Sequence, residues 1–150
     1  MIALIALAAN ISATGLQPQL QPWSYLVGHC WTGAAPGGAG QDKHCFEPVF
    51  GGQHVRDRHA VISGGREVYA GETIYSVRRN KVTFTYWNSL GGVGVGEAAF
   101  RSGEWQFTGT IHATPDGAEQ PLRASWRKVA AGYEVRESAT DKPRLFKRAD

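Results

Sequence analysis

Short runs of alternating apolar and polar residues, each closed by a turn signal, constrain the fold of this chain most strongly. Four of these signals are the dipeptides Gly64-Gly65, Arg79-Asn80, Gly91-Gly92 and Ser102-Gly103. Alternation with a period of two is typical of half-buried strands, whereas no long segment has the period of a helix. The high glycine content, 19 of 150 residues, agrees with many tight turns. The sequence therefore predicts an all-β protein.

About ten short strands are expected along the chain. They cover 23–33, 44–50, 53–62, 68–77, 82–90, 93–100, 105–113, 122–129, 133–138 and 144–148. Most connections are too short for a crossover helix, so sequential strands should be antiparallel neighbours. An open meander leaves two exposed edges, and closure into a barrel removes them. We therefore expect a single antiparallel meander closed into a barrel of about 8–10 strands, with a β-sandwich as the alternative.

The length of 150 residues fits one domain, which we expect over 21–150. Residues 1–20 are interpreted as a signal peptide or a disordered N-terminal segment. Residues 1–9 form an uncharged apolar run that is far shorter than the roughly 20 residues of a membrane span but fits the core of a signal peptide. Cleavage sites with small residues follow at 6–8 and 11–13, although no Lys or Arg precedes the run. We therefore expect a periplasmic or secreted protein without a stable membrane span.

The two cysteines, Cys30 and Cys45, lie in strand-like runs on either side of a Gly/Pro-rich connection. If these runs pair as a hairpin, the two side chains can lie opposite each other. In an exported chain this placement predicts a disulfide, and two free buried thiols are the alternative. A zinc site that also uses His29 and His44 is not expected, because neighbouring residues of a strand point to opposite faces. The sequence thus predicts a disulfide and no metal site.

Four segments resemble a known family: LVGHCWTG, HCFEPVFGGQHVRDRH, YAGETIY and FTYWNSLGG. The first is similar to the opening strand of lipocalin-like (calycin-type) barrels, in which a Gly-x-Trp element begins the barrel and the Trp closes its base. Together the segments resemble a bacterial family of lipocalin-like domains of unknown function, from about Trp23 onward. Here two residues rather than one separate Gly28 from Trp31, which a bulge would have to absorb. The resemblance implies a barrel with an apolar pocket and no particular reaction.

Asp57 and His59 are the most notable polar pair of the expected barrel. They are two residues apart on one strand, so they share a face at a distance of about 7 Å. Such a pair can act as a general acid or base, which makes both residues candidate catalytic groups. The alternative is a structural pair completed by Arg56 or Arg58. The candidate ligand contacts are Trp31, Asp57, His59, Tyr75, Tyr86, Asn88, Glu97 and Trp126.

Barrels of this size often hold one small ligand, so we expect an exported barrel that binds a small apolar or amphipathic molecule. Haem, with a histidine as axial ligand, is a variant of this hypothesis, and no other cofactor is expected. A first alternative is an enzyme that performs proton transfer or hydrolysis with His59, Asp57 and Tyr86 or Glu97. A second alternative is a structural or interaction protein with a filled lumen. The residues that would fill it are Trp31, Trp87, Trp105 and Trp126.

Several other function classes have no support in the sequence. The formal charge is +3, but the basic residues are scattered, so a nucleic-acid partner is not expected. Gly-x-Ser-x-Gly, phosphate-loop and His-Glu-x-x-His motifs are absent. Residues 91–96 are glycine-rich, yet no helical pattern follows them, so they are interpreted as a turn and a strand rather than a dinucleotide-binding loop. No feature specifies an oligomeric state.

Overall fold

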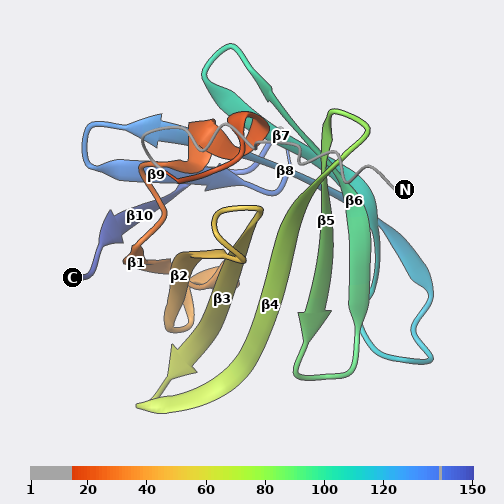
Figure 1. Ribbon diagram of the computed structural model, residues 1–150. Coiled ribbons are helices and arrows are strands. Elements are labelled where there is room, and N and C mark those ends of the chain that lie inside the picture. The colour runs from red at the N-terminus through yellow and green to blue at the C-terminus, as the bar shows by residue number, and fades with distance from the viewer. Residues whose placement is uncertain (1–14, 139) are drawn as a thin grey trace, which may run out of the picture.

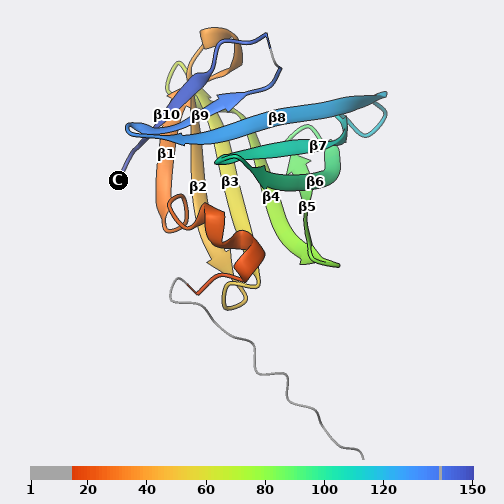
Figure 2. The same cartoon turned by 90° about the horizontal axis from the view of Figure 1, so that it is seen from above.

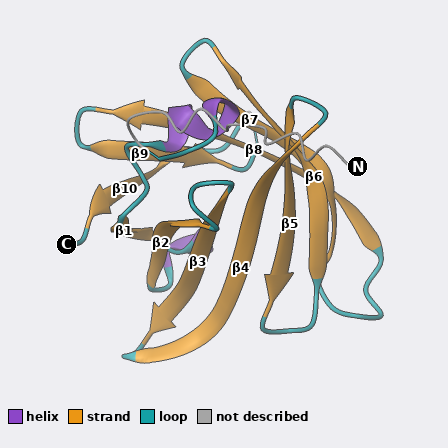
Figure 3. Ribbon diagram, viewed as in Figure 1, coloured by secondary structure: helices purple, strands orange, loops and turns teal. Residues whose placement is uncertain are grey.

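The computed structural model describes residues 15–138 and 140–150, and its main feature is one antiparallel sheet that closes on itself (Figure 1). The ten strands of the described residues follow one another around the barrel in chain order, and β1 closes the ring by pairing with β10. Helix is confined, in the described part of the chain, to two short 3₁₀ segments (Figure 3). The prediction of an all-β meander closed into a barrel is confirmed, and the alternative of a β-sandwich is wrong.

The strands are β1 (His29–Ala34), β2 (Gln41–Val49), β3 (His54–Ser63), β4 (Arg66–Arg78), β5 (Lys81–Asn88), β6 (Val93–Arg101), β7 (Glu104–His112), β8 (Glu119–Val129), β9 (Gly132–Arg136) and β10 (Arg144–Arg148). The 3₁₀ helices are η1 (Pro18–Trp23) and η2 (Pro36–Gly38). Hairpin turns fall at the predicted signals. Arg79 and Asn80, for example, both have positive φ, which is the geometry that suits a two-residue hairpin. The first expected strand is only partly formed, because Trp23 ends η1 and β1 begins at His29.

One end of the barrel, its base, is closed by η1 and the residues beside it (Figure 2). The buried side chains of this segment are Leu16, Leu20, Trp23 and Leu26. Trp23 stacks on Trp105 of β7, with ring centroids 4.1 Å apart. The packed part of the chain thus includes Leu16 and Leu20, which the expected boundary at residue 21 placed outside the domain. The expected apolar core of the signal peptide, 1–9, lies outside the described residues.

The extra residue between Gly28 and Trp31 is accommodated by the backbone conformation of Gly28, just before β1 begins. Gly28 has a φ of +86°, a left-handed conformation that glycine adopts without strain, and β1 begins directly after it. Trp31 is buried and its indole N–H donates to the carbonyl of Leu26 at 3.2 Å. Its ring packs edge-on against Tyr133 of β9. Trp31 therefore points inward and helps to close the base.

The predicted disulfide between Cys30 and Cys45 is confirmed. The two residues are direct register partners of β1 and β2, and their Cα atoms are 4.1 Å apart. Both thiols are therefore consumed, and neither is free to ligate a metal. The disulfide is compatible with a non-cytoplasmic location. Separately, no helix in 15–138 or 140–150 has the length and apolar character needed to cross a membrane.

Candidate functional site

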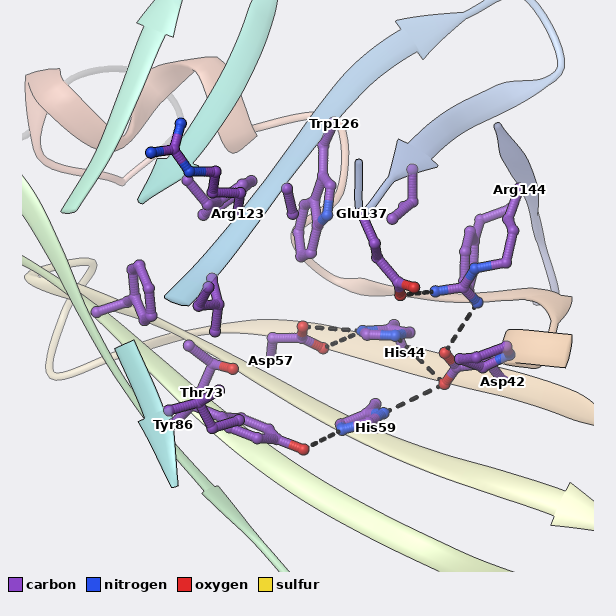
Figure 4. A pocket seen from close by; sticks show the side chains of 18 of the residues that line it. Asp42, His44, Asp57, His59, Thr73, Tyr86, Arg123, Trp126, Glu137 and Arg144 are labelled. Carbon is purple, nitrogen blue, oxygen red and sulfur yellow. Dashed lines mark hydrogen bonds and ion pairs between the residues drawn. The ribbon is translucent and has the colours of Figure 1, made fainter. Parts of the chain in front are cut away.

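A cavity of about 790 Å³ lies inside the barrel, beyond the aromatic side chains that fill the base. Much of its wall is aromatic or aliphatic, with Tyr75, Phe84, Phe107, Ile111, Leu122 and Trp126 among the lining residues. The opposing wall, on β2 and β3, carries a group of polar side chains (Figure 4). The four tryptophans that one alternative placed in the lumen lie in different places: Trp126 lines the cavity, and Trp31 and Trp105 are buried in the core. Trp87 lies on the outer surface and is 45% exposed.

Two Asp-x-His triplets face each other across the β2–β3 hairpin. Asp42 and His44 are two residues apart on β2, and Asp57 and His59 are two residues apart on β3, so each pair projects to one face of its strand. His44 and His59 are direct register partners. The side chains pair crosswise, because each carboxylate reaches the imidazole of the other strand. We call these four residues the His–Asp cluster.

The contacts within the His–Asp cluster are short and converge on two carboxylates. His44 Nδ1 lies 3.0 Å and 2.9 Å from the two carboxylate oxygens of Asp57. Oδ1 of Asp42 lies 3.3 Å from His44 Nε2 and 3.2 Å from His59 Nδ1. The two imidazole rings are stacked with their centroids 4.8 Å apart. The carboxylate of Asp42 thus contacts both histidines, whereas the carboxylate of Asp57 contacts His44.

A chain of hydrogen bonds leads from the His–Asp cluster to two tyrosines. His59 Nε2 is 3.1 Å from the hydroxyl of Tyr86, which in turn is 2.5 Å from the hydroxyl of Tyr69. One set of proton positions satisfies every bond: His59 Nδ1–H donates to Asp42, Tyr86 O–H donates to His59 Nε2, and Tyr69 O–H donates to Tyr86. Asp42, His59 and Tyr86 therefore form a carboxylate–imidazole–hydroxyl chain on the cavity wall (Figure 4).

Arg144 of β10 completes the polar wall from the far side of the barrel seam. Its Nη1 donates to Asp42 Oδ2 at 3.3 Å and to the carbonyl of Ala34 at 2.7 Å. Its Nη2 donates to Glu137 at 2.6 Å. The guanidinium also lies over the ring of Phe146, 5.3 Å from the ring centroid. Arg144 thus occupies one oxygen of Asp42 and leaves the other to the histidines.

Burial and charge shift the protonation equilibria of this wall. Burial lowers the pKa of His44, but the charges of Asp57 and Asp42 and their hydrogen bonds outweigh it and raise the pKa to about 10. Burial raises the pKa of Asp42, but its hydrogen bonds with His44 and His59 outweigh burial and hold the pKa well below its usual range. Burial, together with Tyr69, raises the pKa of Tyr86. At neutral pH the wall therefore holds a charged His44 and a protonated Tyr86.

Three potential metal ligands also meet on this wall. One ligand atom each from Asp42, His44 and His59 lies within 4.8 Å of the others. Two imidazoles and a carboxylate are a donor set suited to zinc and other divalent transition metals. No metal site was expected from the sequence, and the grouping around the two cysteines that was considered there is a different one.

Five of the predicted site residues lie on the cavity wall: Asp57, His59, Tyr75, Tyr86 and Trp126. Asp57 and His59 share a face, as expected for residues two apart on one strand, and both bond to residues of other strands. On β2, Asp57 bonds to His44 and His59 bonds to Asp42.

Three of the predicted ligand contacts, Trp31, Asn88 and Glu97, are not among the residues that line this cavity. Trp31 packs in the base, as described above. Asn88 ends β5, where its Oδ1 accepts hydrogen bonds from the backbone N–H groups of Leu90 and Gly92. Glu97 pairs with Lys81 on the outer surface at 3.1 Å. Glu97 faces outward because Gly96, its neighbour, faces Phe84 inside, where a Cβ would come within 2.7 Å of that ring.

Asp42, His44, Tyr69 and Arg144 were missed as site residues by sequence reasoning. The repeated Asp-x-His triplet is a signal that could have indicated the first two, because matched triplets on the two strands of a hairpin can face each other. Tyr69 and Arg144 carry no such signal.

The site is thus an aromatic cavity with a His–Asp cluster, two linked tyrosines and an arginine on one wall. Comparison with known protein families and with curated proteins finds no match for this chain.

Proposed function

We propose that the protein binds one small amphipathic molecule inside the barrel. The observation that carries this proposal is the cavity of about 790 Å³, which is within the size range of small-molecule sites. One end of the ligand would lie among aromatic side chains and the other at the His–Asp cluster. Such a division between an apolar body and a few convergent polar groups is the usual composition of a ligand pocket.

The apolar end would be held by closely packed rings. Phe107 and Trp126 lie with their ring centroids 4.8 Å apart, and Tyr75 is 6.4 Å from Trp126. These side chains are already fixed by their neighbours in the base, so ordering them on binding costs little conformational entropy. A flat or branched apolar group would therefore find a preformed surface.

The charge of the polar wall favours a ligand end that is neutral or cationic. At the His–Asp cluster, Asp42, Asp57 and Glu137 contribute three negative charges, against the positive charges of His44 and Arg144. Arg123 of β8 also lines the cavity, but it lies away from the cluster (Figure 4). A carboxylate would add a further negative charge in a partly buried site, which is unfavourable. We therefore propose a hydroxyl or amine as the polar group.

We also propose that the protein is exported and belongs to the lipocalin-like barrels. The disulfide of the first hairpin supports a periplasmic or secreted location, because such bonds persist in oxidising compartments. The closed antiparallel barrel with a tryptophan in its base supports the lipocalin-like assignment. Mass spectrometry of the protein from periplasmic and culture-medium fractions tests the location.

Interior binding is tested by titrating chelator-treated protein with the fluorescent amine 1-aminoanthracene. Ala124→Phe projects a ring into the cavity, so the probe affinity should fall at least about tenfold, because a phenyl group occupies the volume that the probe needs. Ser125→Phe is the matched control, since the next residue of β8 points to the opposite face and its affinity should be unchanged. Equal affinity of Ala124→Phe and the unsubstituted protein would contradict interior binding.

The same probe tests the polar end by displacement. Decylamine and 1-decanol should displace 1-aminoanthracene at lower concentrations than decanoate, because only decanoate brings a negative charge to the His–Asp cluster. Displacement by decanoate that is as effective as by decylamine would contradict the proposed polar group and leave interior binding intact.

A second candidate function is an enzyme that transfers protons to a bound substrate. The specific observation is the chain Asp42–His59–Tyr86, in which a carboxylate orients an imidazole and the imidazole accepts from a hydroxyl. Burial raises the pKa of Tyr86, so its phenol suits a proton donor better than a nucleophile. Any activity found in a survey of ester and carbonyl substrates should be lost in His59→Gln and Tyr86→Phe and retained in Glu97→Gln. Activity that persists in the first two variants would contradict this function.

A further inference from the structure

We infer that Asp42, His44 and His59 form a site for one divalent transition-metal ion, with Zn²⁺ as the reference ion. The three potential ligand atoms lie within 4.8 Å of one another on the cavity wall. Imidazole nitrogen suits zinc, iron, nickel and copper, whereas magnesium and calcium prefer all-oxygen sites. Two imidazoles with one carboxylate therefore select the first group.

Two of the three ligand-to-ligand distances already have the length found around a metal ion. Ligands that lie 2.0–2.2 Å from one ion are roughly 3.0–3.5 Å from each other. Oδ1 of Asp42 is 3.3 Å from His44 Nε2 and 3.2 Å from His59 Nδ1. The two imidazole planes are only 19° apart, so binding requires the stacked rings to tilt until both nitrogens point at one position. This is a change of side-chain torsion that leaves the β2–β3 pairing intact.

The atoms behind these ligands are those that support a metal centre. His44 presents Nε2 to the site while its other nitrogen, Nδ1, is held by the carboxylate of Asp57 at 2.9 Å. His59 presents Nδ1 in the tautomer that carries its proton on Nε2, and Nε2–H then donates to the hydroxyl oxygen of Tyr86 at 3.1 Å. A histidine that binds metal typically donates its second N–H to such a partner, which fixes the ring orientation. Both imidazoles of the cluster have that partner.

The charge of the wall also suits a divalent cation. In the ion pairs at the His–Asp cluster, the negative charges come from three carboxylates: Asp42, Asp57 and Glu137. The only permanent positive charge in these four ion pairs is that of Arg144. When His44 releases its proton to bind the ion, two negative charges remain, and a divalent ion would balance them. Arg144 bonds to Oδ2 of Asp42 and so leaves Oδ1 for the ion. Because all three ligands come from one wall, the rest of the coordination sphere would be open to the cavity.

The test is calorimetric titration of chelator-treated protein with Zn²⁺. One ion should bind per chain, and His44→Gln and His59→Gln should each abolish saturable binding. Asp57→Asn should keep one site and weaken it about 10–100-fold, because it changes only the partner of a ligand. His112→Gln is the matched control: His112 also lies beside a carboxylate, 3.6 Å from Glu119, but on the outer surface. Binding that is lost in His112→Gln and kept in His44→Gln would overturn the site.

A measurement on the unsubstituted protein guards against variants that fail to fold. In NMR spectra, one equivalent of Zn²⁺ should shift the imidazole resonances of His44 and His59 and leave those of His29, His54 and His112 in place. Absence of saturable binding, or shifts confined to the surface histidines, would overturn the proposal.

The metal site and the proposed ligand pocket can fail separately. Ala124→Phe should lose 1-aminoanthracene and keep Zn²⁺, since Ala124 lies on β8 and is not a ligand. Loss of Zn²⁺ binding in this variant would overturn the assignment of the ion to the β2–β3 wall.

Discussion

The most informative perturbation is Asp57→Asn, which removes one charge from beside the buried His44 and keeps the shape of the side chain. In the native protein the pKa of His44 is raised from 6.5 to about 10, in spite of burial, by Asp57 and Asp42. At about 1.4 kcal/mol per pH unit, this difference corresponds to an upper limit of roughly 5 kcal/mol. Removing one partner of a buried ion pair typically costs about 3–5 kcal/mol. We expect the free energy of unfolding at neutral pH to fall by an amount in this range.

The pH dependence separates this effect from simple loss of packing. The pKa of His44 is higher in the folded protein than in the unfolded chain, so protonated His44 stabilises the fold. This stabilisation is fully present below pH 6.5, where both states bind the proton, and is lost as the pH rises through about 10. Between these values the unfolded chain releases the proton of His44 first, so native stability should decline with pH. In Asp57→Asn the decline should be smaller, because His44 keeps only Asp42 as a charged partner.

The assay is urea unfolding of metal-free protein followed by tryptophan fluorescence from about pH 6 to pH 10, with the titration of His44 followed by NMR. Glu97→Gln is the control, because it breaks an exposed pair with Lys81 and should cost less than about 1 kcal/mol. Two results would refute the reasoning. One is a native His44 that titrates near its ordinary value, and the other is an unchanged pH slope in Asp57→Asn.

Three further predictions concern the scaffold, and urea unfolding measures each of them. Reducing Cys30–Cys45, which are 15 residues apart, should destabilise the barrel by about 3 kcal/mol, so an unchanged unfolding midpoint with dithiothreitol would argue against this role. Trp23→Ala should cost about 3–5 kcal/mol, because it empties the centre of the base; a loss below about 1 kcal/mol would show that the base tolerates the cavity. Gly52→Ala should cost clearly more than Gly51→Ala. Both have positive φ, but only at Gly52 would a Cβ overlap backbone, and equal losses would contradict that overlap.

Much of the fold could be predicted because its signals are local. Arg79 and Asn80 form the two-residue turn between β4 and β5, where both have the positive φ that joins two antiparallel strands in a tight hairpin. Cys30 and Cys45 could be paired because a hairpin brings residues near in sequence to opposite positions. Tyr75, one of the candidate ligand contacts, likewise lines the cavity. Each of these inferences requires no knowledge of a distant segment.

The candidate site could be predicted only in part, because its bonds join different elements. Asp57 and His59 were found, but their partners are not each other. The partner of Asp42 across the seam, Arg144, lies 102 residues further along the chain, and no local pattern connects the two. Glu97 was expected inside the barrel and lies outside it. Alternation along β6 gives two equivalent faces, and the packing of Gly96 against Phe84 decides which face is inside.

The sequence by itself therefore determined the strands, the turns, the antiparallel order and the disulfide of the first hairpin, because these depend on side-chain period, turn chemistry and short connections. Only the tertiary structure decided the closure through β1 and β10, the cavity of about 790 Å³ and the crosswise pairing of the two Asp-x-His triplets. These features depend on long-range register and on the volume that packed rings leave empty. Neither quantity is a property of any single segment of the chain.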